Sequence, residues 1–292
     1  MTLEAIKAYP DGEEITLKTK AILEPLFKED QSSVSEFTFA NIYLFRKKHG
    51  YLLSKLSDNT LAISGSEAGK AFLLLPFGLP EAAVLVDILK AGVTLKCITE
   101  EDVKALEGLG VKIQEDRDNF DYIYLREELS ELKGGKFLKK RNRASAFTTK
   151  YNAEAVKLDE DRLDDALTVL DKWHEDRLNA GKDDGDYHET KEALHSMKEL
   201  GLMGCIYYAD KLAVAFEIGE ALGRSDTFAV HFEKGLTEYS GVLQYVVKSF
   251  ASLMPSSFKY INREQDLGIP SLRRAKELLR PIKFIKKYRV SL

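Results

Sequence analysis

The sequence predicts an α+β protein built from two domains. The chain has 292 residues and a mass of 33.0 kDa, which is longer than one average domain and leaves room for two hydrophobic cores. Apolar residues recur with the helical period in some segments and alternate with polar residues in others, so both helices and strands are expected. The charge changes from basic to acidic directly after Lys150, and we therefore predict domains of residues 1–150 and 151–292.

The first half of the chain is predicted to alternate helices with short strands. Amphipathic spacing predicts helices over residues 16–28 and 36–49. Apolar runs separated by turn residues predict strands. These strands are expected over residues 51–56, 60–64, 71–75, 94–98 and 121–125. Further helices are expected over residues 80–90 and 100–106, and the basic segment 127–151 is predicted to be a helical bridge to the second half.

The second half is predicted to begin with two helices and to continue as a sheet. Leu163, Leu167 and Leu170 recur at helical intervals within residues 161–180, and another helix is expected over residues 187–200. The period then changes to two, which predicts three consecutive strands in an antiparallel meander. The meander strands are expected over residues 203–209, 211–220 and 227–233. The predicted order is completed by helix 241–253, strand 258–262, helix 271–279 and strand 282–288.

The composition excludes several classes of protein. With 44% hydrophobic and 31% charged residues, the chain is expected to fold rather than to remain disordered. No apolar run approaches the roughly 18 to 20 residues that span a bilayer, and residues 1–11 lack the apolar core of a secretory signal. We therefore expect a cytoplasmic protein without a membrane span. Cys97 and Cys205 are predicted to be buried thiols, because their number and spacing fit neither a disulfide framework nor a zinc site.

The charged residues are grouped in blocks. Residues 132–153 hold seven basic residues and no acidic one, and residues 271–292 hold eight basic residues against Glu277. Between them, residues 154–192 hold fourteen acidic residues against six basic ones. Such runs are usually solvated helix faces. They can also form patches that bind phosphate groups in spite of the formal net charge of -4.

Three motifs carry a resemblance to a known family. They are Asp121-Tyr122-Ile123-Tyr124, Leu132-Lys133-Gly134-Gly135-Lys136-Phe137 with Lys140-Arg141-Asn142, and Asn262-Arg263-Glu264-Gln265-Asp266-Leu267-Gly268-Ile269-Pro270 with Leu272-Arg273 and Lys276. Together they resemble the DUF2156 family, which is related to the C-terminal domain of phosphatidylglycerol lysyltransferases. The element order of the second half is also similar to the Gcn5-related N-acetyltransferase (GNAT) fold. The resemblance implies two tandem GNAT-like domains, each a mixed, mostly antiparallel sheet flanked by helices.

The same resemblance implies an acyltransferase. The related enzymes move an aminoacyl group from tRNA to an amine or hydroxyl. We therefore expect acyl-CoA or aminoacyl-tRNA as the donor and a small-molecule or peptide amine as the acceptor, with no tightly bound cofactor and no metal site. The alternative is a noncatalytic module that keeps the tandem fold and binds RNA or another protein.

Three residues of the predicted meander are candidates for acid–base catalysis. Glu217 interrupts the apolar run 212–218, where burial would raise the pKa of its carboxyl group, and it is the first candidate for the base. Strand alternation assigns His231 and Glu233 to one face and Phe232 to the other, and a histidine beside a carboxylate can act as a base. The alternative is that these residues are structural or face the solvent.

The predicted helix start near residue 241 is the candidate phosphate site of the donor. Backbone N–H groups at a helix N-terminus attract anions, and a glycine there permits close approach. Resemblance to the acetyltransferase fold assigns Ser240, Gly241 and Gln244 to this role, and Lys234 could add a positive charge. The alternative is that Gly241 is an ordinary turn residue.

Two further polar segments are predicted to contact substrates. The loop after strand 258–262 carries Asn262, Arg263 and Asp266, which suit substrate recognition, and the alternative role of Asp266 is to cap the next helix. The basic segment interleaves aromatic residues with cations, as a groove for single-stranded or tRNA acceptor ends does. Its residues are Lys136, Lys139, Lys140, Arg141 and Arg143, interleaved with Phe137 and Phe147. The alternative is that this helix docks on the acidic segment 154–192.

Overall fold

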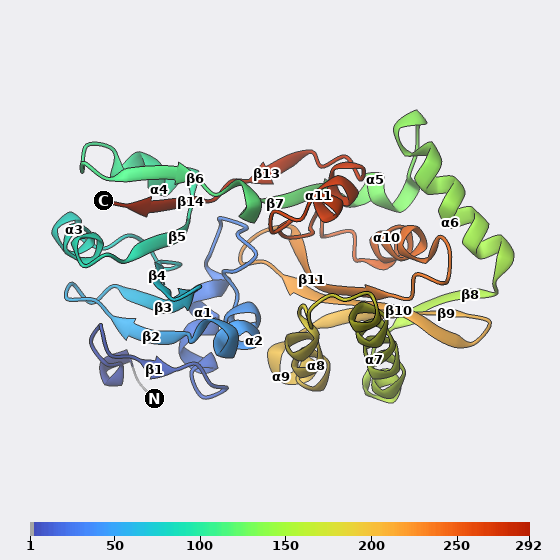
Figure 1. Cartoon of the computed structure of the whole chain (residues 1–292), viewed down its shortest axis with the longest axis horizontal. Coiled ribbons are helices and arrows are strands. Elements are labelled where there is room, and N and C mark those ends of the chain that lie inside the picture. The colour runs from blue at the N-terminus through green and yellow to red at the C-terminus, as the bar shows by residue number, and fades with distance from the viewer. Residues whose placement is uncertain (1–2) are drawn as a thin grey trace.

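The first of two sheets combines strands from the first half of the chain with one C-terminal strand (Figure 1). The computed structural model describes residues 3–292. Across the sheet, the strands within these residues are β1 (Glu13–Glu14), β2 (Leu52–Lys55), β3 (Leu61–Glu67), β4 (Lys70–Leu74), β5 (Thr94–Ile98), β14 (Tyr288–Ser291) and β6 (Lys112–Glu115). The helices of this half are α1 (Lys20–Lys28), α2 (Phe39–His49), α3 (Ala82–Lys90) and α4 (Glu100–Leu106), with 3-10 turns η1 (Leu3–Ala5) and η2 (Arg117–Asn119).

The second sheet lies beside the first along the length of the molecule (Figure 1). Its strands within residues 3–292 are β13 (Lys283–Ile285), β7 (Asp121–Leu125), β12 (Tyr260–Asn262), β11 (Thr227–Gly235), β10 (Leu212–Ala221), β9 (Met203–Ala209) and β8 (Ala153–Lys157). Its helices are α5 (Arg126–Glu131), α6 (Leu138–Lys150), α7 (Leu163–Asn179), α8 (Tyr187–His195), α9 (Met197–Leu200), α10 (Val242–Leu253) and α11 (Pro270–Glu277), with 3-10 turns η3 (Gly135–Phe137) and η4 (Glu160–Arg162).

Both sheets are mixed and mostly antiparallel, as predicted. Among the described strands, the parallel pairs are β4–β5 and β11–β12. The edge strands β6 and β8 were not predicted, because β6 has one apolar residue, Ile113, and the apolar residues of β8 are two alanines and one valine, which is a weak strand signal. The predicted strand 282–288 is also divided, since β13 pairs in the second sheet and β14 in the first.

The two sheets exchange strands and do not divide the chain at residue 150. β7, α5 and α6 come before Tyr151 but belong to the second sheet and its helices, while β14 comes from the C-terminus and lies between β5 and β6. One hydrophobic cluster also joins the halves, because Phe45 of α2 stacks on Phe232 of β11 with ring centroids 6.2 Å apart. The predicted ranges 1–150 and 151–292 therefore differ from the residues that each sheet contains.

A β-bulge interrupts the meander of the second sheet. β10 pairs antiparallel with both β9 and β11, which confirms the predicted meander. Ile218 lies opposite Phe232 and Gly219 lies opposite Val230, so His231 is the extra residue on β11. A bulge moves the side chains that follow it to the opposite faces of the strand. The alternation of apolar and polar residues in the sequence does not reveal the bulge.

The bulge corrects the predicted orientation of the β11 side chains. Phe232 packs in the hydrophobic cluster on the α7 face, whereas Val230 packs in the cluster under α10. Beyond the bulge, Glu233 lies directly opposite Glu217 of β10. Glu233 therefore shares the α10 face with Val230, and the prediction that it shares a face with His231 is wrong.

A buried ion cluster joins the two sheets. Lys287, which connects β13 to β14, is 0% exposed and donates hydrogen bonds to Asp121 of β7 at 2.7 Å and to Glu36. Asp121 also accepts the backbone N–H of Ser35 at 2.9 Å and the side-chain amide of Asn262 at 3.1 Å. Burial lowers the pKa of Lys287, but the carboxylates of Asp121 and Glu36 raise it above its ordinary value, so the ammonium group stays charged.

Replacing Lys287 by methionine is expected to destabilise the protein by about 3–5 kcal/mol, because the carboxylates of Asp121 and Glu36 would remain buried without a cation. Urea unfolding followed by circular dichroism measures this change. The matched control is Lys286→Met on the neighbouring residue, whose side chain is 41% exposed and pairs with Glu115 at the surface. Equal unfolding midpoints for the two variants would contradict the structural role of Lys287.

Candidate functional site

The candidate site lies where β11 and β12 separate. The parallel pairing joins Thr227–Ala229 to Tyr260–Asn262, whereas β11 continues to Gly235. The chain leaves the sheet after β12, and Glu264 adopts a φ of 54° in the turn. Arg263 bridges the resulting gap, because its guanidinium group donates a hydrogen bond to Glu233 on β11.

Glu217 of β10 is completely buried beside this gap. Its side chain is 0% exposed, and Tyr207 of β9 donates its phenolic O–H to Oε1 of Glu217 at 2.7 Å. The other oxygen, Oε2, lies 3.8 Å from a guanidinium nitrogen of Arg263 and has no hydrogen-bond partner among residues 3–292. Buried polar atoms are almost always hydrogen-bonded, so this free oxygen is the feature of the site that needs an explanation.

The electrostatics of the site favour proton transfer at Glu217. Burial raises the pKa of Glu217 well above its ordinary value, and the neighbouring charge of Glu233 raises it further, while Arg263 lowers it. A carboxylate with a raised pKa is a stronger base than an exposed one. The burial and the raised pKa confirm the expectation from the apolar run 212–218, and a catalytic role for Glu217 and Glu233 stays a prediction.

Lys276 of α11 and Tyr207 belong to the site although sequence reasoning gave them no role. The Nζ atom of Lys276 donates to the backbone carbonyl oxygens of Arg263 and Gln265, and burial lowers the pKa of this lysine to about 8. These bonds fix the backbone that carries the Arg263 side chain. Lys276 and Tyr207 reach their partners through tertiary contacts, so no local pattern in the sequence marks them.

His231 is held between two carboxylates. Its Nδ1 atom lies 2.7 Å from Glu264, and its Nε2 atom lies 3.0 Å from Glu220. Burial alone would lower the pKa of His231, but these hydrogen bonds and charges raise it to about 10. A histidine that donates from both ring nitrogens cannot accept another proton, so His231 is a structural cation rather than the predicted base.

The predicted phosphate site at the start of α10 is covered by α6. Gly241 has a φ of 93°, and a Cβ atom added there would lie 2.4 Å from the carbonyl oxygen of Arg143. Glycine is therefore required for the close approach of the two helices. Ser240 is exposed and Gln244 is half-buried at this helix start. A phosphate-binding role for Ser240, Gly241 and Gln244 stays a prediction.

Lys234 lies on the other face of the second sheet. Its Nζ atom is 2.8 Å from Asp186 and 4.5 Å from the ring centroid of Trp173. Lys234 also lies opposite Phe216, which packs in the cluster on the α7 face. The prediction that Lys234 adds charge to the start of α10 is therefore wrong, since the bulge at His231 had shifted the alternation before this residue.

Asn262 and Asp266 hold the loop after β12. Asn262 is fully buried and its amide group donates to Asp121. Asp266 is also fully buried and accepts hydrogen bonds from Tyr122 at 2.6 Å and Arg273 at 2.7 Å. Burial raises the pKa of Asp266, but these hydrogen bonds lower it to about 2. Both side chains are engaged inside the protein, so they position the loop rather than offer free groups to a substrate.

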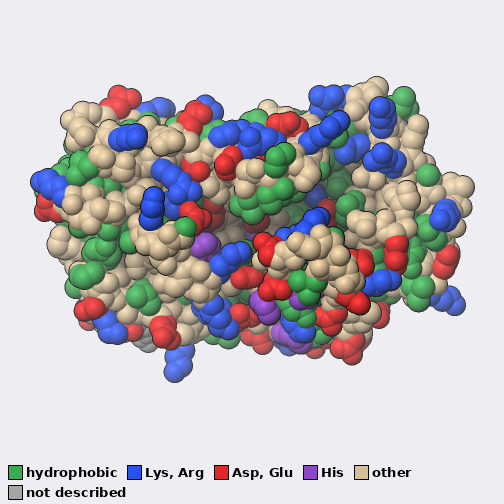
Figure 2. All heavy atoms as spheres, viewed as in Figure 1, with side chains coloured by type: hydrophobic (Ala, Val, Ile, Leu, Met, Phe, Trp, Pro, Cys, Tyr) green, Lys and Arg blue, Asp and Glu red, His purple; other side chains and the backbone are tan. Residues whose placement is uncertain are grey.

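Some basic residues of α6 and of the turn before it bind protein groups, and others have no carboxylate partner. Lys136 pairs with Glu128 at 2.6 Å, and Arg141 donates to the carbonyl oxygen of Leu132. The cations of this segment that have no carboxylate within 4.0 Å among residues 3–292 are Lys139, Lys140, Arg141, Arg143 and Lys150. Lys and Arg side chains gather over α6 on the face drawn in Figure 2. Lys139, Arg143 and Lys150 are exposed to the solvent, whereas Lys140 is half-buried, and its burial lowers the pKa of its ammonium group.

The aromatic residues of this segment are not part of that surface. Phe137 is 1% exposed and Phe147 is 0% exposed, so neither can stack on a base as predicted. Phe147 instead stacks on Tyr245 with centroids 5.0 Å apart, which packs α6 on α10. Much of the second basic stretch, residues 271–292, is also engaged within the fold. The engaged cations are Arg273, Lys276, Lys286, Lys287 and Arg289.

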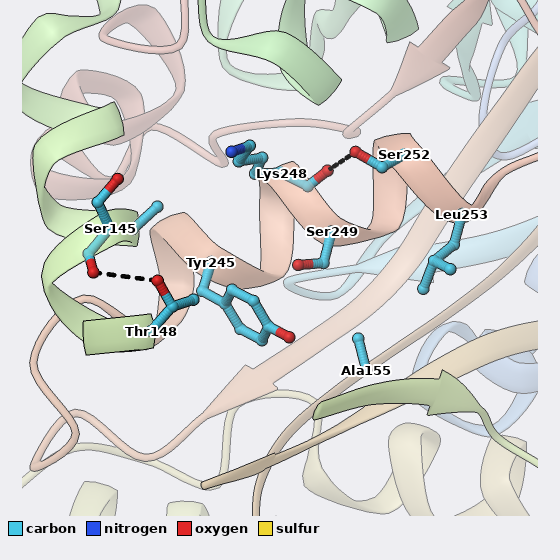
Figure 3. A pocket seen from close by; sticks show the side chains of 9 residues that line it. Ser145, Thr148, Ala155, Tyr245, Lys248, Ser249, Ser252 and Leu253 are labelled. Carbon is cyan, nitrogen blue, oxygen red and sulfur yellow. Dashed lines mark hydrogen bonds between the residues drawn. The ribbon is translucent and has the colours of Figure 1, made fainter. Parts of the chain in front are cut away.

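A pocket of about 310 Å3 lies between α6 and α10 (Figure 3). Its lining residues are Ala144, Ser145, Thr148, Ala155, Tyr245, Lys248, Ser249, Ser252 and Leu253. Tyr245 also contacts Tyr207, with ring centroids 5.9 Å apart. The pocket is therefore separated from Glu217 by the side chain of Tyr207.

Comparison with known families matches residues 27–291 to the family described as "Phosphatidylglycerol lysyltransferase, C-terminal". This chain belongs to that family. A crystal structure of a conserved protein of unknown function from Bacteroides thetaiotaomicron VPI-5482 is 28% identical, covers 96% of this chain and 99% of its own, and has a TM-score of 0.85. The structure of L-PGS from Bacillus licheniformis is 14% identical, covers 96% and 93%, and has a TM-score of 0.65.

The solved structures of this lysyltransferase C-terminal family confirm the predicted tandem GNAT-like fold. An uncharacterized protein of Mycoplasmoides gallisepticum is 25% identical over 207 residues. The match covers 67% of this chain and 65% of that relative, so the chain spans about two thirds of the relative's length.

Within residues 3–292, no helix combines the length and the apolar character needed to cross a membrane. Groups of three or more metal-binding side chains are also absent from this part of the chain. Cys97 and Cys205 are both buried and free, as predicted.

For this family member, the stabilising effect of His231 is expected to depend on pH. The folded-state pKa of about 10 lies above the ordinary value of 6.5, so the contribution is fully present below about pH 6.5 and is lost as the pH rises toward 10. The difference in unfolding free energy between the natural protein and His231→Gln should shrink over this range. His195→Gln, at an exposed position of α8, is the control for loss of a histidine side chain.

Proposed function

We propose that this protein is an acyltransferase that moves an aminoacyl group from aminoacyl-tRNA to an amine acceptor. The observation that carries the proposal is the buried, unpartnered carboxylate oxygen of Glu217 beside the Arg263–Glu233 pair. The family description, which names a lysyltransferase, supports an aminoacyl donor. The gap between β11 and β12 is the proposed position of the reacting ester.

The reaction needs a base and a positive charge. An amine reaches the site as ammonium, and Glu217 takes one of its protons. The free nitrogen attacks the carbonyl carbon of the ester, a C–N bond forms, and the C–O bond to the tRNA ribose breaks. Arg263 stabilises the negative charge that develops on the carbonyl oxygen. The proton on Glu217 then passes to the ribose oxygen, while the nitrogen releases its second proton to solvent.

Three observations favour aminoacyl-tRNA over acyl-CoA as the donor. The carbonyl oxygen of Arg143 lies against the start of α10, and it would repel a pyrophosphate at this helix end. Lys234 faces away from that helix end and binds Asp186. By contrast, Lys139, Arg143 and Lys150 of α6 are exposed, and the phosphates of a large RNA can reach them.

Glu217→Gln is expected to lower turnover by about 100-fold, the usual contribution of a general base. The amide keeps the hydrogen bond from Tyr207, so the unfolding midpoint should not fall. The assay measures transfer from tRNA charged with radiolabelled amino acids to ethanolamine as a simple amine. Glu238→Gln, at a surface residue paired with Lys172, is the matched control and should keep full turnover. Unchanged turnover of Glu217→Gln would remove this residue from the mechanism.

Binding of tRNA is expected to weaken steeply with salt, because cations of α6 would release counterions from its phosphates. Arg143→Ala should reduce the slope of log K against log salt by about 1, the loss of roughly one phosphate contact. Lys90→Ala, on α3 of the first sheet, should leave the slope unchanged. A slope that is the same in both variants would contradict the role of α6.

The same titration tests the other donors and the noncatalytic alternative. Acetyl-CoA should not displace tRNA if the donor is aminoacyl-tRNA. Displacement by acetyl-CoA would favour an acyl-CoA donor. Salt-sensitive tRNA binding without any transfer to an amine would favour the noncatalytic RNA-binding module.

A further inference from the structure

The pocket between α6 and α10 has a lining rich in hydroxyl groups. Figure 3 shows Ser145 and Thr148 extending from α6, opposite Tyr245, Ser249 and Ser252 of α10. Among the described residues, no carboxylate lines the pocket. Its volume of about 310 Å3 lies at the lower end of the range for small-molecule sites, so one nucleotide-sized group is the scale of ligand that it can hold.

The hydroxyl oxygens of this pocket remain available as acceptors. Thr148 donates its hydrogen to the carbonyl oxygen of Ser145 at 3.0 Å, and Ser252 donates to that of Lys248 at 2.8 Å. The lone pairs of both oxygens can therefore accept hydrogen bonds from a ligand. Amino groups of bases and ribose hydroxyl groups supply such donors, whereas an aliphatic ligand would leave these oxygens buried without partners.

One cation lies in the pocket lining, and others lie on a helix that forms its wall. Lys248 lies in its lining, and α6, which carries Ser145 and Thr148, also carries the unpaired cations Arg143 and Lys150. The phenol ring of Tyr245 adds an aromatic wall. Hydroxyl acceptors, an aromatic ring and nearby cations are the groups that bind an unpaired nucleotide by hydrogen bonding, stacking and phosphate contact.

Tyr207 lies between the pocket and the candidate catalytic carboxylate. Ala155 of β8, in the pocket lining, pairs with Tyr207 in the sheet register. Tyr207 contacts Tyr245 on one side and donates its hydroxyl hydrogen to Glu217 on the other. Ala155 and Glu217 therefore lie on β8 and β10, on either side of β9, with the buried side chain of Tyr207 between them.

We infer that this pocket binds one unpaired nucleotide at the 3′ end of the donor tRNA, which would direct the ester toward the gap between β11 and β12. The inference rests on the proposed function, because it assumes a tRNA donor. The inference adds a nucleotide subsite to the proposed function. In this subsite the nucleotide contacts Tyr245 and the hydroxyl groups, while the cations of α6 and Lys248 bind the adjoining phosphates.

The test is a double comparison of protein and RNA variants. Ser249→Trp fills the pocket, and uncharged tRNA is used either intact or without its terminal CCA. Fluorescence anisotropy with 5′-labelled tRNA measures binding at fixed salt. For the natural protein, removal of CCA should weaken binding by about 10-fold, the size of one base-stacking contact. Ser249→Trp should bind intact tRNA about as weakly as the natural protein binds the truncated RNA, with no further loss on truncation.

The control is Ser271→Trp, the same substitution at an exposed residue of α11, which should behave as the natural protein. If circular dichroism shows that Ser249→Trp is unfolded, Thr148→Val removes a hydroxyl from the other wall and should still reduce the effect of CCA removal several-fold. A folded pocket variant that retains the full effect of CCA removal overturns the subsite and leaves the proposed function intact. Absence of salt-sensitive binding of either tRNA to the natural protein overturns both.

Discussion

The ion pair between Lys287 and Asp121 is the contact on which the arrangement of the two sheets depends. Lys287 lies between β13 of the second sheet and β14 of the first, and it binds Asp121 of β7 in the second sheet. A fully buried ammonium group is unfavourable unless carboxylates and hydrogen bonds compensate it. Asp121 and Glu36 provide that compensation, so Lys287 specifies where the C-terminal strand must cross from the second sheet to the first.

The same cluster fixes the loop that carries Arg263. Asn262 and Gln265 both donate to Asp121, and Lys276 binds the backbone carbonyl oxygens on either side of Glu264. The backbone of this loop is therefore held from both directions. Because this backbone is fixed, the guanidinium group of Arg263 spans the gap to Glu233 and remains near Glu217.

In this protein, buried polar groups that have all their hydrogen-bond partners hold the structure together. The proposed chemistry is assigned to a buried group that lacks one partner. Both nitrogens of His231 and both oxygens of Asp266 have partners, and each group is held in one charge state by them. Glu217 differs, because one oxygen is bonded to Tyr207 and the other is free. A group with an unused bonding position and a raised pKa is suited to exchange a proton, whereas a fully bonded group is suited to hold the fold.

The sequence by itself determined the elements that depend on local period: most helices, the three-stranded meander, the buried character of Glu217 and the family, through its motifs. It could not assign the partners of β14 and β7, the unpredicted edge strands, or the bulge at His231. Those features depend on pairing between residues far apart in the chain. The tertiary structure alone decided that Lys234 faces Asp186, that Gly241 lies under α6, and that Arg263 meets Glu217. One extra residue in a strand reverses the side chains after it, and hydrophobic periodicity does not detect a one-residue change.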